Sequence, residues 1–347
     1  MLSQLSWTEP SEVRAHLIGM ALGADKQVIM FGGKGGVGKT TCASATALHY
    51  AKQGLRTLVI STDPTPSLAD IFELEVEPEP GPGIGSAKAG RPPGEPLQVA
   101  EGLPLYLLEL GPEEIKELWD RKFGREVYEV FSSFVDIEYD EFVEFITTVL
   151  PGLGEEFMVD YIRELARSGV YDKLVWDTAP LGQTIGLLRM PALLGEHLRA
   201  APRIYSRLRV SPRSRRSVLE ILRGWEALSE EDLRFLREEV ELAMVTIPEA
   251  LAVRQLGRTI AELEKYGLKF TWLIVNNVIR ADAKRKGEFL QRKARQQRAH
   301  LELLRRSYGH LRLVELPLFP YEITGLERLE EVRRALIGPA PPSRGPW

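Results

Sequence analysis

The chain has 347 residues, of which 44% are hydrophobic and 27% are charged, and its formal net charge is −4. This composition is typical of a globular protein and does not indicate a general nucleic-acid binder. The single cysteine, Cys42, excludes a disulfide within the chain and a multi-cysteine metal site. No stretch approaches about 18 uninterrupted apolar residues, and the N-terminus lacks the apolar core of a signal peptide, so we expect a cytoplasmic protein.

One stretch, GGKGGVGKTT at residues 32–41, organises the rest of the chain. The apolar residues 26–31 before it predict a buried strand, and the alanine-rich residues 40–54 after it predict a helix. The pattern GxxxxGK[ST] fits from Gly33 and ends at Lys39-Thr40. A strand, a glycine-rich loop and a helix N-terminus together form a phosphate-binding cradle.

The P-loop pattern predicts which residues contact the phosphates and Mg²⁺. Glycines allow the backbone to wrap around phosphate with its N–H groups pointing inward. Lys39 is expected to reach the β- and γ-phosphates, and the Thr40 hydroxyl to bind Mg²⁺. The predicted nucleotide contacts in this stretch are Gly33, Lys34, Gly35, Gly36, Val37, Gly38, Lys39, Thr40 and Thr41. The alternative is a glycine-rich turn that binds nothing.

Further elements follow in chain order. Residues 11–22 predict a short amphipathic helix before the P-loop, and residues 56–64 predict a second buried strand that ends at Asp63. Residues 77–96 contain six Pro and five Gly, a composition that favours a flexible loop. A strand is expected at 105–110.

The middle of the sequence is mainly helical. We expect a helical subdomain formed by residues 112–170 and 185–240, interrupted by a strand at 171–180 that contains Asp177. Apolar side chains recur at helical spacing in 125–150. They either pack on the main core or form the floor of an apolar groove. Seven arginines in 199–216 form either a solvated face or a contact with an acidic partner or anionic lipid.

The C-terminal third again alternates strands and helices. Strands are expected at 241–250 and 269–277, and a long basic helix at 280–306; a disordered tail is expected at 338–347. The repeated alternation predicts an α/β fold, a doubly wound and mostly parallel sheet of the P-loop NTPase type with an inserted helical subdomain. We expect this single P-loop ATPase domain to extend over residues 1–347.

Four ordered motifs give the chain a family resemblance. The lysine at position 34 makes KGGVGKT a deviant Walker A motif, which resembles that of the dimeric ATPases that include MinD and ParA, the nitrogenase iron protein and the ArsA/GET ATPases. The sequence DPTPSL at 63–68 is similar to switch I of the ArsA/GET family, and DTAPLGQT at 177–184 is similar to its switch II. TIPEALAV at 246–253 resembles the family's CIPEFLSL.

The resemblance implies an ATPase that hydrolyses ATP with Mg²⁺. It makes Lys39 and Lys34 part of the catalytic machinery, with Lys34 reaching the nucleotide of the partner protomer. Asp63 would position or activate the attacking water. Asp177 would hold Mg²⁺, through a water, together with Thr40.

The same resemblance extends the nucleotide site to later parts of the chain. Glu249 takes the place of a glutamate that touches nucleotide across the dimer. Asn276 matches an asparagine that reads the adenine edge, and Pro317 and Leu318 would lie near the base. Two departures concern the switches, since Pro66 and Gln183 stand where the family has histidine.

Within the family, the sequence favours a homodimeric, prokaryotic-type targeting factor for tail-anchored proteins. Its partners would be the apolar transmembrane segments of client proteins and a membrane receptor, and nucleic acid is not expected to bind. No zinc is expected, because the CxxC of the eukaryotic factors is missing. The residues expected to line the client groove are Phe142, Phe145, Leu188 and Leu193.

Two other functions remain as alternatives. One is a positioning or partitioning ATPase like MinD or ParA, and the other is the ATPase subunit of an arsenite-type anion pump. Arsenite-pump ATPases usually carry a tandem repeat and several cysteines, whereas this chain has one P-loop and one cysteine.

Overall fold

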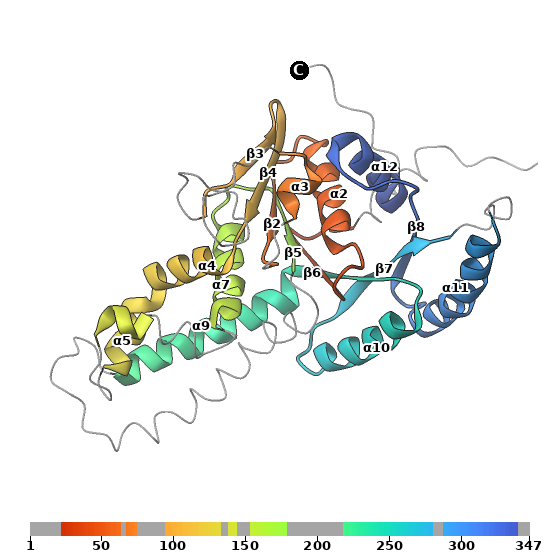
Figure 1. Cartoon of the computed structure of the whole chain (residues 1–347). Coiled ribbons are helices and arrows are strands. Elements are labelled where there is room, and N and C mark those ends of the chain that lie inside the picture. Colours follow the sequence, from red (N-terminus) through yellow and green to blue (C-terminus); the bar gives the residue numbers. More distant parts are fainter. Residues whose placement is uncertain are drawn as a thin grey trace, which may run out of the picture.

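The fold is an α/β architecture built on one sheet of eight strands (Figure 1). In this computed structural model, the described residues are 22–63, 67–74, 94–132, 138–143, 153–178, 218–279 and 287–338. The spatial order of the strands is β3-β4-β2-β5-β1-β6-β7-β8. Their bounds are β1 Val28–Gly33, β2 Thr57–Ser61, β3 Leu97–Ala100, β4 Leu103–Glu109, β5 Lys173–Asp177, β6 Val240–Thr246, β7 Phe270–Val278 and β8 Arg312–Pro317.

All neighbouring strands run parallel except β3, which pairs antiparallel with β4 at one edge. The P-loop strand β1 lies between β5 and β6, which come much later in the chain. The chain moves from β1 to β2 and β4 on one side and later to β6, β7 and β8 on the other. In sheets of this kind, ligands bind at the carboxyl ends of the strands where the order reverses.

Helices cover both faces of the sheet. Their bounds are α2 Lys39–Ala51, α3 Leu68–Ile71, α4 Pro112–Trp119, the π-helical turn η1 Asp120–Gly124, α5 Arg125–Phe131, α7 Leu153–Arg167, α9 Val218–Glu238, α10 Ala250–Glu264, α11 Glu288–Ser307 and α12 Gly325–Ile337. Helices α2 and α12 pack on one face. Helices α4, α7 and α9 pack on the other face, where α10 and α11 also cover β6 and β7.

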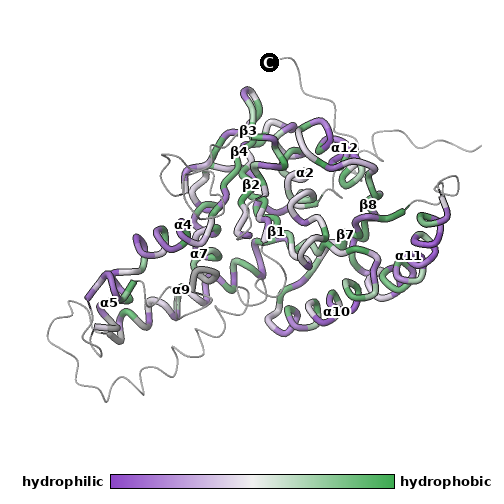
Figure 2. Tube along the Cα trace, in the orientation of Figure 1, coloured by the Kyte–Doolittle hydropathy of each residue, from purple (hydrophilic) through white to green (hydrophobic). Residues whose placement is uncertain are grey.

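The alternation of side chains along each strand builds these two layers. In β1, Ile29 and Phe31 belong to the core shared with α2, whereas Val28 and Met30 belong to the core shared with α7. Both sets are almost completely buried, as expected for a parallel strand covered on both faces. Figure 2 shows hydrophobic residues along the central strands and many hydrophilic ones on α4 and α11.

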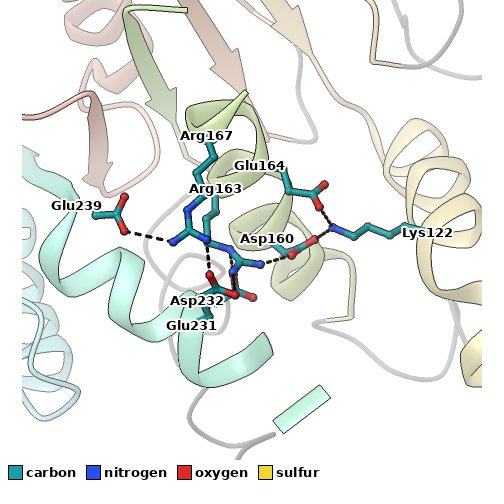
Figure 3. Close-up of polar contacts among 8 residues, drawn as sticks. All are labelled: Lys122, Asp160, Arg163, Glu164, Arg167, Glu231, Asp232 and Glu239. Carbon is teal, nitrogen blue, oxygen red and sulfur yellow. Dashed lines mark hydrogen bonds and ion pairs between the residues drawn. The ribbon is translucent and has the colours of Figure 1, made fainter. Parts of the chain in front are cut away.

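Helices α4, η1, α5, α7 and α9 form a helical arm that extends away from the sheet (Figure 1). A group of charged side chains fastens η1, α7 and α9 together (Figure 3). At its centre, Arg163 on α7 is almost completely buried; its guanidinium lies 2.5 Å from Asp160 and 2.9 Å from Asp232. Lys122 on η1 and Arg167 on α7 pair with further carboxylates around it. This charged cluster ties helices that are distant in the sequence.

One residue predicted for a client groove has a different environment. Phe142 is fully buried, and its ring packs 5.3 Å from that of Tyr128 and 6.3 Å from that of Tyr139, measured between centroids. In this structure Phe142 thus packs as a core residue, and its role in a client groove stays a prediction. Phe145, Leu188 and Leu193 lie outside the described residues.

The α/β prediction is confirmed, and most predicted strands are present within a few residues. The short edge strand β3 was not predicted, and the basic helix is described from Glu288 to Ser307, while residues 280–286 lie outside the described residues. The predicted helix at 11–22 and most of the 77–96 loop and 338–347 tail lie outside the described residues. No helix in the described part of the chain is long and apolar enough to span a bilayer.

Candidate nucleotide site

The P-loop connects β1 to α2 at the carboxyl edge of the sheet. Gly38 immediately precedes α2 with φ = 92°, a left-handed conformation that favours glycine. A Cβ at this position would collide with the Asn276 side chain. At Gly33 a Cβ would lie 2.5 Å from the Val245 carbonyl oxygen on the neighbouring strand. Conformation and close packing therefore require these two glycines.

Lys39, the first residue of α2, is buried, and its Nζ lies 3.5 Å from the Lys34 carbonyl oxygen. Burial lowers the pKa of Lys39, and the carboxylates of Asp177 and Asp63 act in the opposite direction. Asp177, the last residue of β5, and Asp63, two residues after β2, therefore both act on the lysine of the P-loop. An anion placed over the P-loop amides would meet this ammonium group.

Asp177 ends β5, paired in register with Phe31 of β1, and is completely buried. Neither of its carboxylate oxygens has a hydrogen bond of good geometry with a described residue. Burial raises the pKa of Asp177 to about 7, while the adjacent Thr40 hydroxyl and Lys39 act to lower it. A buried carboxylate beside a hydroxyl and an ammonium fits a site for a divalent cation with phosphate.

The raised pKa of Asp177 predicts a pH-dependent stability. Because the folded pKa of about 7 exceeds the unfolded value of 3.8, ionisation destabilises the folded state as pH rises from about 4 to about 7. The cost approaches about 4 kcal/mol and stays constant at higher pH. In EDTA and without nucleotide, Asp177→Asn is expected to melt above the wild type, by a difference that grows between pH 5 and pH 8. Differential scanning calorimetry measures it.

The exposed Asp140 supplies the control for this experiment. Asp140→Asn is expected to change the melting temperature by an amount that does not grow with pH. A constant difference between Asp177→Asn and the wild type across the same range would contradict the prediction.

The segment after β2 approaches Thr40. The backbone N–H of Asp63 donates to Ser61 Oγ at 3.3 Å, which fixes the start of this segment at the end of β2. At its other end, Ser67 Oγ lies 3.5 Å from Thr40 Oγ1. The side chains predicted to act on water and on Mg²⁺ thus share one edge of the sheet.

Glu109, at the end of β4, belongs to the same edge and was not predicted. Its Oε1 accepts a hydrogen bond of 2.6 Å from the backbone N–H of Leu68. Burial raises the pKa of Glu109, and the backbone amides of Leu68, Ala69 and Ser67 act to lower it. The only signal in the sequence was its position at the end of a predicted strand next to the strand that carries Asp63.

Asn276 lies directly beneath the P-loop. Its Nδ2 donates to the Val37 carbonyl oxygen at 2.9 Å, and its Oδ1 accepts from the N–H of Asn277 at 2.9 Å. Asn277 has φ = 58°, which is uncommon for a residue other than glycine. The side chain predicted to read adenine therefore supports the P-loop in this structure, and its role toward the base stays a prediction.

The remaining predicted contacts lie toward the surface. Glu249 precedes α10 and forms a 3.6 Å ion pair with Lys293; its side chain is half exposed. Pro317 ends β8, and Leu318 beside it donates its N–H to the Val278 carbonyl oxygen at 2.9 Å. Within the loop, Val37 is buried whereas Gly35 and Gly36 are exposed. Lys34, Thr40 and Thr41 are partly buried.

Most of the chain is similar in sequence to one known protein family. The family model described as "Anion-transporting ATPase" matches residues 26–338, which is most of the chain. The chain belongs to the anion-transporting ATPase family. It is accordingly an ATPase, and this confirms the resemblance seen in the motifs.

Individual relatives of this ATPase also carry names that describe them as ATPases. ATPase ARSA1 of Chlamydomonas reinhardtii is 31% identical over 89% of this chain and 42% of the algal protein, so the chain spans less than half of that relative. A putative arsenical pump-driving ATPase of Prosthecochloris vibrioformis is 29% identical over 91% of this chain and 76% of its own length. ATPase GET3B of Arabidopsis thaliana is 28% identical over 93% of this chain and 82% of its own length.

Proposed function

We propose that the protein is an ATP-driven homodimeric switch that binds apolar segments of membrane proteins in the cytoplasm and delivers them to a membrane receptor. The observation that carries the proposal is the connection between the site and the helical arm. Helix α7 leads directly into β5, whose last residue is Asp177, and α9 leads into β6 beside the P-loop strand. A change at the nucleotide would act on both helices.

The proposed chemistry uses the groups at the carboxyl edge of the sheet. The P-loop amides and Lys39 bind the β- and γ-phosphates. Thr40 and Asp177 would hold Mg²⁺, which would supply positive charge to the phosphates. Asp63 orients the attacking water and accepts its proton.

The homodimer follows from the size of the client and from the surface of the site. A transmembrane helix of about 20 residues is about 30 Å long and apolar around its whole circumference, so the arms of two protomers would enclose more of its surface than one arm. In this proposal Lys34 and Glu249 contact the nucleotide of the second copy. Their side chains are partly or half exposed, as such a role requires.

Structure and sequence argue against the two rival functions. Relatives named for arsenical pumps favour a pump subunit, but Cys42 is the only cysteine of the chain and is fully buried. A positioning ATPase like MinD or ParA would leave the helical arm without a role. Binding of DNA through the Arg-rich 199–216 segment would show a steep salt dependence.

A crosslinking experiment tests the carrier function. A photoreactive transmembrane peptide is incubated with the Asp63→Asn protein, loaded with ATP or ADP, and crosslinked positions are identified by mass spectrometry. We expect crosslinks at Phe145, Leu188 or Leu193 with ATP that are lost with ADP, because only the ATP-bound dimer offers a continuous apolar surface.

Two controls test whether crosslinking requires an apolar peptide and whether the protein is a dimer with ATP. A peptide of the same length with charged residues at its centre should not crosslink, and light scattering should report a dimer with ATP. No crosslink in either nucleotide state, with clear ATPase activity in the wild type, would overturn the carrier function in favour of the positioning ATPase.

A further inference from the structure

The short helix α3 has an unusual N-terminus. Its N-cap residue, Ser67, makes no side-chain capping hydrogen bond. The carboxylate of Glu109 takes this role from another strand, since its Oε1 accepts the N–H of Leu68 at 2.6 Å. The backbone amides of Ser67 and Ala69 also interact favourably with this carboxylate. An acceptor from β4 thus satisfies amides that the local sequence leaves open.

The position of Glu109 is itself fixed. It is the last residue of β4, where it pairs in parallel register with Ser61 at the end of β2. The next residue, Leu110, donates its N–H to the Ser61 carbonyl oxygen at 3.1 Å. The pairing of β4 with β2 therefore holds the Glu109 carboxylate close to Ser61, after which the Asp63 segment begins.

Hydrogen bonds hold the chain on either side of residues 64–66, which lie outside the described residues. Asp63 is held through Ser61 Oγ at one end, and at the other Glu109 holds the residue after Ser67 through the N–H of Leu68. Only three residues separate Asp63 from Ser67, so the position of the second limits the reach of the first. In this arrangement Ser67 Oγ lies 3.5 Å from Thr40 Oγ1.

We propose that Glu109 is a positioning residue for ATP hydrolysis. By accepting the amides at the start of α3, it sets the place of Asp63, and of the Ser67 hydroxyl beside Thr40, relative to the P-loop. Glu109 does not touch the reacting atoms in this role. The inference rests on the part assigned to Asp63 in the proposed function.

Two substitutions at one position test the inference. Glu109→Ala removes the acceptor, so the Asp63 segment loses its anchor, and a displacement of about 1 Å can cost roughly 10²-fold in rate. We expect its kcat to fall at least about 10-fold, with the ADP dissociation constant within about twofold of the wild type. Glu109→Gln keeps one oxygen that accepts the bond from the N–H of Leu68, and it should retain more than half of kcat.

Hydrogen exchange adds a readout that does not depend on turnover. Without nucleotide, the peptide covering residues 67–71 is expected to exchange faster in Glu109→Ala than in the wild type or in Glu109→Gln. The matched control is Glu101→Ala, an exposed glutamate in the turn that joins β3 to β4. It should change neither kcat nor this exchange rate.

The outcomes separate this inference from the proposed function. A wild-type kcat in Glu109→Ala, an equal loss in Glu109→Gln, or a loss of kcat together with nucleotide binding and melting temperature would each overturn it. If Asp63→Asn is slow while Glu109→Ala is normal, only the positioning role fails. If Asp63→Asn itself turns over normally, the proposed role of Asp63 fails.

Discussion

Asp63→Asn is expected to bind ATP as the wild type does and to hydrolyse it about 10²- to 10⁴-fold more slowly, the range typical of a lost general base. The carboxylate at position 63 acts electrostatically on both Lys39 and Asp177, so it lies within the charged site without belonging to the phosphate cradle. An amide keeps its size but no longer accepts a proton from water. Calorimetry with a non-hydrolysable ATP analogue measures binding, and phosphate release measures turnover.

Two further variants distinguish a loss of turnover from a loss of nucleotide binding and from a nonspecific effect of substitution. Lys39→Ala is expected to lose nucleotide binding, since it removes the buried ammonium that meets the phosphates. Asp70→Asn, at an exposed position on α3 just beyond the same segment, should behave like the wild type in both assays. A normal turnover rate in Asp63→Asn would show that another group handles the water.

Arg163→Ala is expected to destabilise the protein by about 3–5 kcal/mol, because it removes the cation that two buried carboxylates share, although Asp160 keeps its ion pair with Lys122. The side chains of Arg163, Asp160 and Asp232 are 4%, 2% and 1% exposed, respectively. Figure 3 shows the guanidinium between the two carboxylates, and Glu231 lies 2.5 Å from it on the outer side. The midpoint of urea unfolding, followed by circular dichroism, measures the change.

The neighbouring arginine supplies a matched control. Arg167 is 49% exposed and pairs with Glu231 and Glu239 at the surface, where ion pairs contribute about 0–1 kcal/mol. Arg167→Ala should therefore shift the midpoint only slightly. Similar shifts in both variants would show that burial of the network contributes little.

The framework of the fold could be predicted because it depends on local patterns. The apolar run before Gly33 and the lysine and threonine after Gly38 are sufficient to specify a strand, a phosphate loop and a helix. The two aspartates were predicted for the same reason, since β5 finishes in Asp177 and Asp63 lies two residues after the end of β2. The strand β3 was missed, as its four residues follow a proline- and glycine-rich stretch and gain regularity only by pairing with β4.

The parts that could not be predicted depend on tertiary contacts. Phe142 belongs to an apolar helical stripe that suits a groove and a core equally well, and the rings that cover it come from Tyr128 and Tyr139. Asn276 was predicted as a base-reading residue, but its bond to Val37 depends on β7 lying near the P-loop. Glu109 resembles any acid at a strand end until the fold brings α3 to it.

The single thiol of the chain has a practical consequence for labelling chemistry. Cys42 lies in α2 with no exposed surface, and burial raises its pKa to about 12, with Asp177 adding to the rise. The thiolate is the form that reacts with maleimides, so the native thiol should stay unmodified while the protein is folded. The wild-type chain thus serves as an unreactive background in which one introduced surface cysteine carries a fluorophore or spin label. Probes placed on the helical arm would then report its movement without any change at the nucleotide site.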